Sequence, residues 1–336
     1  MKQSLQSWLE KQWYQNTIPS FWLQFLATLF KNLVRFRQFF YQKGILKQTR
    51  LPVPVIIVGN LTVGGTGKSP LVIYLAKILS DTGYTPGIIS RGYGGKAKHS
   101  PQRVFADSNP EDVGDEAVML ATRSKRPVAV GSMRSKAAEL LLKETICNVI
   151  ISDDGLQHYA LQRDIEIAVI DGERRFGNGY CLPAGPLREP VERLHGVNFV
   201  VINGATVEAS EFSMGIQAEF AINLSTGESK PLHHFRSTQV HALAGIGNPQ
   251  RFFTLLNHFD IPYIRHIFPD HYLFQAADLQ YDDHLPVLMT EKDAVKCRPY
   301  ATQQHWFIPI NAELPPRFTQ QLLRLLKEKS HGPQFT

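Results

Sequence analysis

The chain reads Val55-Ile-Ile-Val-Gly-Asn-Leu-Thr-Val-Gly-Gly-Thr-Gly-Lys-Ser-Pro70 where an apolar run passes into glycines and then into Lys68-Ser69. This order predicts a buried strand, a glycine-rich turn and a helix, because glycines let backbone N–H groups converge on phosphate oxygens at a helix start. A lysine here reaches the β- and γ-phosphates, and the adjacent serine hydroxyl binds Mg²⁺. We therefore predict a nucleotide-binding loop made by Thr62, Val63, Gly64, Gly65, Thr66, Gly67, Lys68 and Ser69.

The loop departs from the strict pattern G-x-x-x-x-G-K-[ST] at Thr62, where the pattern has glycine. Loops of this type serve kinases, motor ATPases and switch GTPases alike, so the loop alone does not define the reaction. Membrane-targeting ATPases carry an additional lysine before the two glycines, where this chain has Val63. Guanine specificity is not indicated, because Thr290-Glu-Lys-Asp293 does not match the order Asn-Lys-x-Asp.

The composition is that of a globular protein of about two domains. The 336 residues are 43% apolar and 20% charged, which excludes a disordered or collagen-like chain. The three cysteines lie far apart, which argues against a disulfide framework and a structural zinc site. The net charge of +6 comes from residues 1–60, which hold eight Lys/Arg and one acid, whereas the rest holds 28 basic and 29 acidic side chains. We therefore expect no nucleic-acid partner, and nothing in the sequence predicts a protein partner.

Residues 1–50 predict a basic amphipathic helical segment. Apolar side chains recur at helical spacing on one face, at Trp22, Leu26, Leu29, Leu33, Phe36 and Phe40, and polar ones on the other, at Gln24, Thr28, Lys31, Arg35, Gln38 and Gln42. The uncharged run of residues 18–30 rises only about 20 Å as a helix, against a hydrocarbon core of roughly 30 Å, so a span is not expected. An aromatic face backed by cations is typical of a helix on an anionic membrane surface. The alternative is that the apolar stripe packs on the protein's own body.

From residue 53 onward, short apolar runs alternate with helical stretches, which predicts an α/β fold of the P-loop NTPase type with a mainly parallel sheet. We expect strands at 53–58, 85–89, 128–130, 149–152, 167–170 and 199–202, and helices at 69–79 and 136–143. Residues 51–204 are assigned to this core domain and 205–240 to a linking hairpin region. Residues 241–336 are assigned to a smaller C-terminal α/β domain with strands near 241–244 and 287–289.

Charged residues gather where predicted strands end. Asp153 and Asp154 follow an apolar run, in the position of a Walker-B-type aspartate that holds Mg²⁺, and the alternative is an exposed turn. Ser90-Arg-Gly-Tyr-Gly-Gly95 follows the second strand, at the edge where open α/β sheets bind ligands, although a plain flexible turn accounts for it nearly as well. Asp115 and Glu116 open a helix, and helix capping alone accounts for acids at that place.

In combination and in order, these motifs resemble those of the tetraacyldisaccharide 4′-kinase family of lipid A biosynthesis. The matching stretches are 60–70, 90–95, 114–116, 153–158, 171–179, 182–189, 268–272 and 290–296. The match is dense over residues 53–195 and thin beyond residue 200. Thr62 at the position of the first Walker glycine is how this family reads, so that departure supports the resemblance.

The resemblance implies transfer of the γ-phosphate of ATP to the 4′-hydroxyl of a tetraacylated glucosamine disaccharide 1-phosphate, with ATP and Mg²⁺ as cofactors. It implies a peripheral enzyme at the cytoplasmic face of a Gram-negative inner membrane, whose partners are the lipid substrate and the anionic membrane surface. Asp115 and His271 are then a catalytic pair, although an isolated histidine is more often structural.

The remaining predicted roles follow from the same motifs. Lys68 and Asp154 join the pair as catalytic residues, and Ser69, Asp153 and Glu116 bind the metal. Substrate binding is assigned to Arg91, Gly92, Tyr93, His158, Glu173 and Arg174. Which of Asp153 and Asp154 touches the metal stays open. Two alternatives remain for the function: a nucleotide-driven membrane-association switch, which needs no acceptor base, and a kinase for a soluble metabolite.

Overall fold

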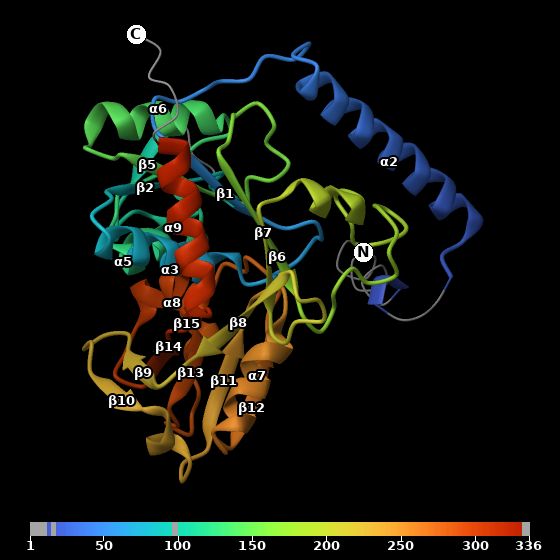
Figure 1. Cartoon of the computed structure of the whole chain (residues 1–336). Helices are drawn as coiled ribbons and strands as arrows, with labels where there is room; N and C mark the ends of the chain where they lie inside the picture. Colours follow the sequence, from blue (N-terminus) through green and yellow to red (C-terminus); the bar gives the residue numbers. More distant parts are fainter. Residues whose placement is uncertain (1–11, 15–17, 96–99, 331–336) are drawn as a thin grey trace.

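The computed structural model describes residues 12–14, 18–95 and 100–330, which form two β-sheets flanked by helices (Figure 1). The larger sheet has nine strands in the order β15-β8-β7-β6-β1-β5-β2-β4-β3. Its strands are β1 Val55–Gly59, β2 Pro86–Ser90, β3 Gln102–Val104, β4 Val128–Val130, β5 Val149–Asp153, β6 Ile165–Asp171, β7 Phe199–Asn203, β8 Glu211–Gln217 and β15 Asn311–Glu313. Only β3 and β15 run antiparallel to their neighbours. The predicted α/β fold with a mainly parallel sheet is therefore confirmed.

The smaller sheet has six strands in the order β10-β9-β14-β13-β11-β12. Its strands are β9 Phe220–Asn223, β10 Ser229–Pro231, β11 Val240–Ala244, β12 Tyr263–Ile267, β13 Val287–Thr290 and β14 His305–Ile308. Helix α7, Pro249–His258, packs on this sheet through Phe252, Phe253 and Leu256. The elements joined to the sheet are α7 Pro249–His258, α8 Glu291–Cys297 and the 3₁₀ turns Leu232–Phe235, Ala276–Leu279 and Arg298–Tyr300.

The larger sheet is covered on both faces, which explains why β1 is an unbroken apolar run. Ile56 and Val58 belong to the same core as Leu71 of helix α3 (Lys68–Asp81), whereas Ile57 packs with Leu141 of helix α6 (Arg134–Glu144). The covering elements are α3 Lys68–Asp81, α4 Pro110–Val113, α5 Asp115–Ser124, α6 Arg134–Glu144 and the 3₁₀ turn Val191–Gly196. This layering leaves the carboxyl end of β1, and the loop that follows it, at the edge of the sheet.

The expected boundaries after residue 204 differ from those in the structure. Within 205–240, β8 joins the larger sheet beside β7, and only β9 and β10 form a hairpin, in the smaller sheet. Within 241–336, β15 pairs with β8, and α9 Pro316–Ser330 returns to the larger core. The cause is the apolar stripe of α9, where Phe318, Leu322 and Leu326 are fully buried. The two crossings between the sheets therefore lie side by side, because Gln217 of β8 pairs with Asn311 of β15.

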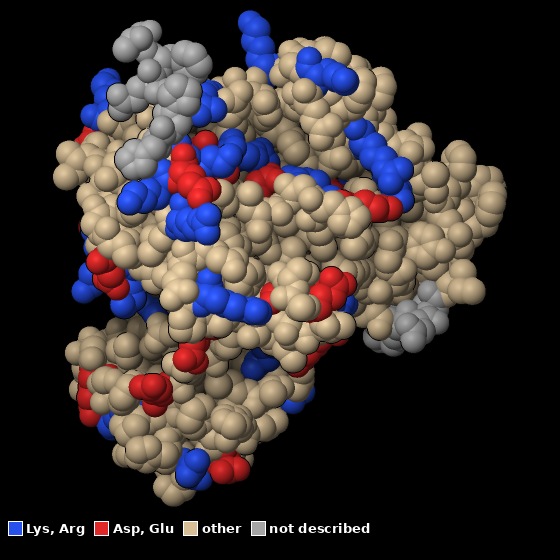
Figure 2. Space-filling view, viewed as in Figure 1, with Lys and Arg blue, Asp and Glu red and all other residues tan. Residues whose placement is uncertain are grey.

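Helix α2, Phe21–Gln42, lies along the outside of the molecule (Figure 1). Its apolar side chains face away from the body, with exposed fractions of 73% for Trp22, 60% for Leu33 and 59% for Phe36. The side that meets the body is mixed: Ala27 is buried, Phe30 packs against a small core that includes Leu61 and Leu187, and Gln38 donates to Glu189 at 2.7 Å. The alternative in which the apolar stripe packs on the protein's own body is therefore wrong for these residues. Figure 2 shows the end of this helix nearest Phe21 as a surface without charged side chains.

No helix in the described part of the chain is long and apolar enough to cross a bilayer. The predicted N-terminal segment also includes residues 1–11 and 15–17, which lie outside the described residues, as do residues 331–336 of the predicted C-terminal unit.

Candidate functional site

The conformation of the loop between β1 and α3 depends on contacts of Thr62, Thr66 and Gly67. Gly67 has φ of 94°, and a Cβ there would collide with the amide of Asn203, which donates to the carbonyl of Thr66 at 3.0 Å. Thr62 forms an antiparallel bridge with Leu187, an extended position that does not require glycine. The departure from the strict loop pattern at Thr62 thus has a local structural reason.

Lys68 and Asp154 meet at the mouth of this loop. The Lys68 ammonium lies 3.3 Å from Oδ1 of Asp154, and the Arg188 guanidinium contacts both oxygens at 3.0 and 3.1 Å. Burial disfavours the charged form of Asp154, but these two cations outweigh it and hold its pKa at about 2. Asp154 is therefore an ionised carboxylate between two cations. This geometry brings together two of the predicted catalytic residues and adds Arg188, which had no predicted role.

Asp153 ends β5 beside Val58 of β1 and is 1% exposed. Its Oδ1 has no hydrogen-bond partner among the described residues. Burial, together with repulsion from Glu116, raises the pKa of Asp153 to about 7, although Lys68 opposes the shift. A buried carboxyl oxygen without a partner, beside a phosphate loop, fits a position for a cation.

Few carboxylates are available to hold such a cation. No group of three or more His, Cys, Asp or Glu side chains suited to a metal occurs in the described ranges. Mg²⁺ does not need one, since it is usually held by one or two carboxylates together with phosphate oxygens and water. Glu116, the third predicted metal ligand, lies 3.1 Å from the Lys292 ammonium.

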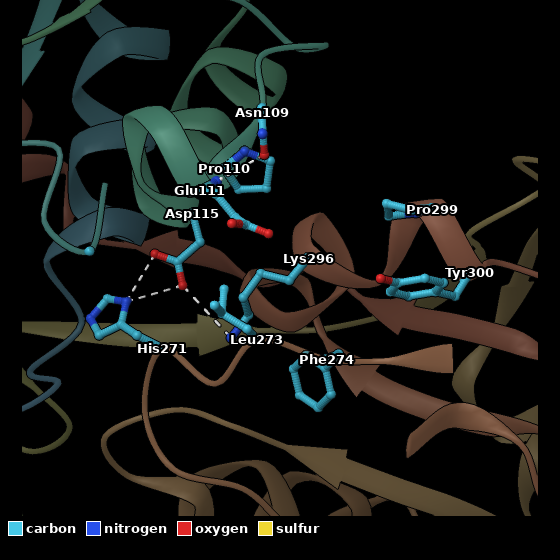
Figure 3. A pocket seen from close by; sticks show the side chains of 11 residues that line it. Asn109, Pro110, Glu111, Asp115, His271, Leu273, Phe274, Lys296, Pro299 and Tyr300 are labelled. Atoms are coloured by element: carbon cyan, nitrogen blue, oxygen red, sulfur yellow. Dashed lines mark hydrogen bonds and ion pairs between the residues drawn. The ribbon is translucent and has the colours of Figure 1, made fainter. Parts of the chain in front are cut away.

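Asp115 and His271, far apart in the sequence, form a hydrogen-bonded pair (Figure 3). Asp115 is the first residue of α5 and 4% exposed, and Nδ1 of His271 lies 3.1 and 3.2 Å from its two oxygens. The hydrogen bond to Asp115 raises the pKa of His271, although burial opposes it. Burial also opposes ionisation of Asp115, but His271, Lys292 and Lys296 outweigh it and lower its pKa. An ionised Asp115 therefore accepts the hydrogen bond from Nδ1 of His271, which leaves Nε2 as the ring nitrogen that can take up a proton.

A cavity of about 100 Å³ lies next to this pair, and Figure 3 shows its lining. Its polar residues include Asn109, Glu111, Asp115, His271 and Lys296, and its apolar ones Leu273, Phe274, Pro299 and Tyr300. The Asp115–His271 pair therefore borders a small cavity that both polar and apolar side chains line.

The loop of Arg91, Gly92 and Tyr93 lies beside the Asp115–His271 pair. Gly92 has φ of 70°, and a Cβ there would lie 3.0 Å from the carbonyl of Val113, so the loop packs closely on the start of α5. The Tyr93 ring lies 5.0 Å from the His271 ring. Gly92 thus has a structural reason to be glycine, and Tyr93 lies beside the predicted catalytic pair.

Glu173 and Arg174, two further predicted substrate residues, lie apart from the Asp115–His271 pair. Their backbone N–H groups donate to Asp171 at 3.0 and 3.1 Å, and the Arg174 guanidinium lies over the Tyr14 ring. Within the described residues, no contact joins their side chains to Arg91, Tyr93 or His158. The structure therefore does not bring these two predicted substrate residues to the others.

Comparison with known proteins agrees with this arrangement. A family model described as tetraacyldisaccharide-1-P 4′-kinase matches residues 19–327. The chain belongs to this family. A tetraacyldisaccharide 4′-kinase of Nitrosococcus oceani is 52% identical over 95% of this chain and 94% of its own length. One of Methylobacillus flagellatus is 48% identical over 97% of this chain and 98% of its own length.

The fold of this chain is also similar to that of a solved structure. A crystal structure described as "apo" form LpxK from Aquifex aeolicus in complex with ATP has a TM-score of 0.77 and 29% identity, covering 90% of this chain and 97% of its own. The predicted P-loop kinase fold and the resemblance to the 4′-kinases are confirmed. Membership of this family favours a lipid kinase over the membrane-association switch and the soluble-metabolite kinase.

Several charged residues of this 4′-kinase site were not identified from the sequence. Arg134 is buried and donates to the carbonyls of Asp153 and Asp154 at 3.2 and 3.3 Å. Arg188 contacts Asp154, and Lys292 and Lys296 contact the acids at the start of α5. The only available signal was the presence of Arg188, Lys292 and Lys296 inside motifs shared with the family, because their partners lie elsewhere in the sequence.

The lowered pKa of His158 in this 4′-kinase leads us to expect a loss of stability in mild acid. Burial, followed by the nearby guanidinium groups of Arg134 and Arg163, lowers its pKa from 6.5 to about 4. Between these values the unfolded chain binds a proton that the folded chain does not, so the free energy of unfolding falls as pH falls from 6.5 to 4. We expect His158→Gln to reduce the slope of Tm against pH over this range, measured by calorimetry. His195→Gln, at an exposed position, is the control, and an unchanged slope in the His158 variant would contradict the prediction.

Proposed function

We propose that the phosphate loop and the Asp115–His271 pair form one active site, which transfers the γ-phosphate of ATP to the 4′-hydroxyl of tetraacyldisaccharide 1-phosphate. Family membership supports the reaction, and the adjacency of the two sites supports the assignment of the residues. A Cβ at Gly247 would lie 3.3 Å from the backbone N of Gly65 and 3.3 Å from Oδ2 of Asp270, the residue before His271. The loop that carries His271 is therefore next to the loop that would hold the phosphates, and this observation carries the proposal.

Each residue has a distinct task in the proposed reaction. Lys68 and the N–H groups of the loop bind the β- and γ-phosphates and neutralise charge that develops during transfer. The attacking hydroxyl loses its proton to the Asp115–His271 pair, its oxygen bonds to the γ-phosphorus, and the bond from that phosphorus to ADP breaks. Asp115 keeps Nδ1 of His271 engaged and stabilises the imidazolium.

Ser69, Asp153 and Glu116 are the proposed ligands of Mg²⁺, which supplies charge neutralisation between the phosphates. The unpartnered oxygen of Asp153 and its raised pKa support this role for Asp153. Asp154 is already paired with Lys68 and Arg188, which favours Asp153 as the carboxylate free to contact the metal.

The direct test is incubation of the purified chain with ATP labelled at the γ-phosphate and with the lipid disaccharide 1-phosphate. We expect a labelled lipid whose phosphate is on the 4′-oxygen. Hydrolysis of ATP without a labelled lipid would contradict the proposal and support the membrane-association switch.

We propose further that α2 lies on an anionic bilayer, at the cytoplasmic face of the inner membrane. The outward apolar side chains of α2 support this position, because an aromatic face left open to water is otherwise unfavourable. The acyl chains of the substrate would stay in the bilayer while the sugar reaches the active site. Lys31 and Arg35 of α2 lie 3.7 and 3.6 Å from Glu192, and the half of the Arg35 side chain that stays exposed is available to an anionic headgroup.

Removal of this apolar face is expected to release the protein from vesicles. The variant replaces Phe25, Leu29, Leu33 and Phe36 with serine, and each side chain contributes roughly 1.5–3 kcal/mol when buried in an apolar medium. We expect partition into vesicles of anionic phospholipid to fall about 100-fold or more, measured by co-sedimentation. A matched control replaces Ile146 and Val207, which are exposed elsewhere, with serine. Equal partition of the α2 variant and the control variant would contradict the membrane role of α2.

A further inference from the structure

Asp115 has a second charged partner, Lys296, which belongs to a buried ion cluster with Asp293; Figure 3 shows the contact between Lys296 and Asp115. The Lys296 ammonium lies 2.9 Å from Oδ1 of Asp293 and 3.7 Å from Oδ2 of Asp115. All three side chains are buried: the exposed fractions are 8% for Lys296, 4% for Asp115 and 0% for Asp293. A buried lysine is costly unless its charge is balanced, so this arrangement has to be explained.

Contacts other than that with Lys296 hold the Asp293 side chain in place. Thr290 is the N-cap of α8, and its hydroxyl donates to Oδ2 of Asp293 at 2.7 Å. The backbone N–H of Gly245 donates to the same oxygen at 2.9 Å. Oδ1 of Asp293 therefore points to Lys296, one helical turn along α8 on the same side. The lysine nitrogen is also held 5.0 Å from the centre of the Phe274 ring.

The contacts of Asp115 show what this lysine adds. Oδ1 of Asp115 accepts the backbone N–H of Glu116 at 2.8 Å and lies 3.1 Å from His271. Oδ2 lies 3.2 Å from His271, and Lys296 is the other charged group on it in the described residues. Without Lys296, the backbone N–H of Glu116 on Oδ1 would be the one close contact in the described residues that holds this carboxylate independently of His271, so His271 would follow any rotation of the Asp115 side chain.

We infer that Lys296, held by Asp293, is a positioning residue that fixes the Asp115 carboxylate so that His271 faces the acceptor hydroxyl. The inference rests on the proposed role of the Asp115–His271 pair and extends it to α8. A 1 Å displacement of a catalytic group costs on the order of 10²-fold in rate. Lys296 therefore acts on turnover and not on nucleotide binding, because it contacts neither Lys68 nor the loop of residues 62–69.

The competing account is that Lys296 only balances charge between α5 and α8. A charge-neutral double variant separates the two accounts. Lys296→Met alone leaves the Asp293 carboxylate buried without its cation, which lowers stability. Adding Asp293→Asn removes that charge, while the amide oxygen still accepts from Gly245 and Thr290. We expect Lys296→Met/Asp293→Asn to recover the Tm of the parent protein within a few degrees. Its kcat remains reduced about 10- to 100-fold, with the KM for ATP changed less than twofold.

The control uses the other ion pair between the same two helices. Arg123 of α5 and Glu291 of α8 are 2.6 Å apart and contact neither Asp115 nor His271. Arg123→Met/Glu291→Gln is expected to keep the parent kcat in the lipid kinase assay. Recovery of kcat together with Tm in the Lys296→Met/Asp293→Asn protein would overturn the inference. Asp115→Asn is assayed in parallel. Full turnover in that variant would overturn the proposed catalytic pair. If Asp115→Asn is inactive but the Lys296→Met/Asp293→Asn protein is fully active, only the positioning role is overturned.

Discussion

Lys68→Ala is expected to abolish phosphoryl transfer to the lipid while leaving the fold intact. The ammonium is the only side-chain cation of the 62–69 loop, and the charge of the transferring phosphoryl group would lose its nearest positive partner. Loss of one preorganised charge-stabilising group costs about 10²–10³-fold in turnover, and we expect at least that reduction in steady-state assays with labelled ATP. Asp154 retains Arg188 as a partner, so its carboxylate is not left unpaired.

The matched control for this prediction is Lys77→Ala. Lys77 is on the same helix, α3, and pairs with Asp81 at 2.8 Å on the exposed side. Its removal changes the charge of α3 equally but does not touch the loop. Turnover near the parent value in Lys68→Ala, with the parent Tm, would refute the assignment of the phosphate loop.

Asp115→Asn is expected to reduce transfer to the lipid about 10²- to 10⁴-fold, with little change in ATP affinity. Asparagine has nearly the same shape, but it lacks the negative charge that stabilises the imidazolium of His271. The hydroxyl of the acceptor sugar would then have no effective base. Single-turnover rates and equilibrium titration with a fluorescent ATP analogue separate the chemical step from nucleotide binding.

Asp112→Asn is the corresponding control. Asp112 lies three residues earlier, in the exposed part of α4, and its side chain contacts none of the catalytic residues in the described structure. A parallel loss of ATP affinity and turnover in Asp115→Asn would identify Asp115 as a metal ligand or a structural residue instead of part of the base.

The local elements of the first half were predictable from the sequence. The strand at 128–130 and the helix after Lys68 are found where their apolar patterns place them, because the strand is buried throughout and the helix buries one apolar face in the larger core. The phosphate loop was also predictable, since all of its functional groups are consecutive in the chain.

Contacts between distant segments were not predictable in this way. Asp115 and His271 are 156 positions apart, and no periodicity links them; only the family resemblance paired them. The return of α9 to the larger core was missed because its apolar stripe fits any sheet of the right size. Arg188 and Lys296 gain their roles from acids that are brought close by the fold, so their charge alone indicated nothing.

The paired crossings at β8 and β15 limit how the two halves of the enzyme can move. Because Gln217 and Asn311 are paired neighbours in the sheet, the two connections between the halves must bend together as one two-stranded unit. A twist of one half against the other would break this pairing, whereas a bend in which β8 and β15 move together preserves it. Asp115 belongs to the larger half and His271 to the smaller one, so a bend at this connection would change the distance between the two members of the proposed catalytic pair. Assembly of the proposed pair would therefore depend on closure of the two halves about β8 and β15.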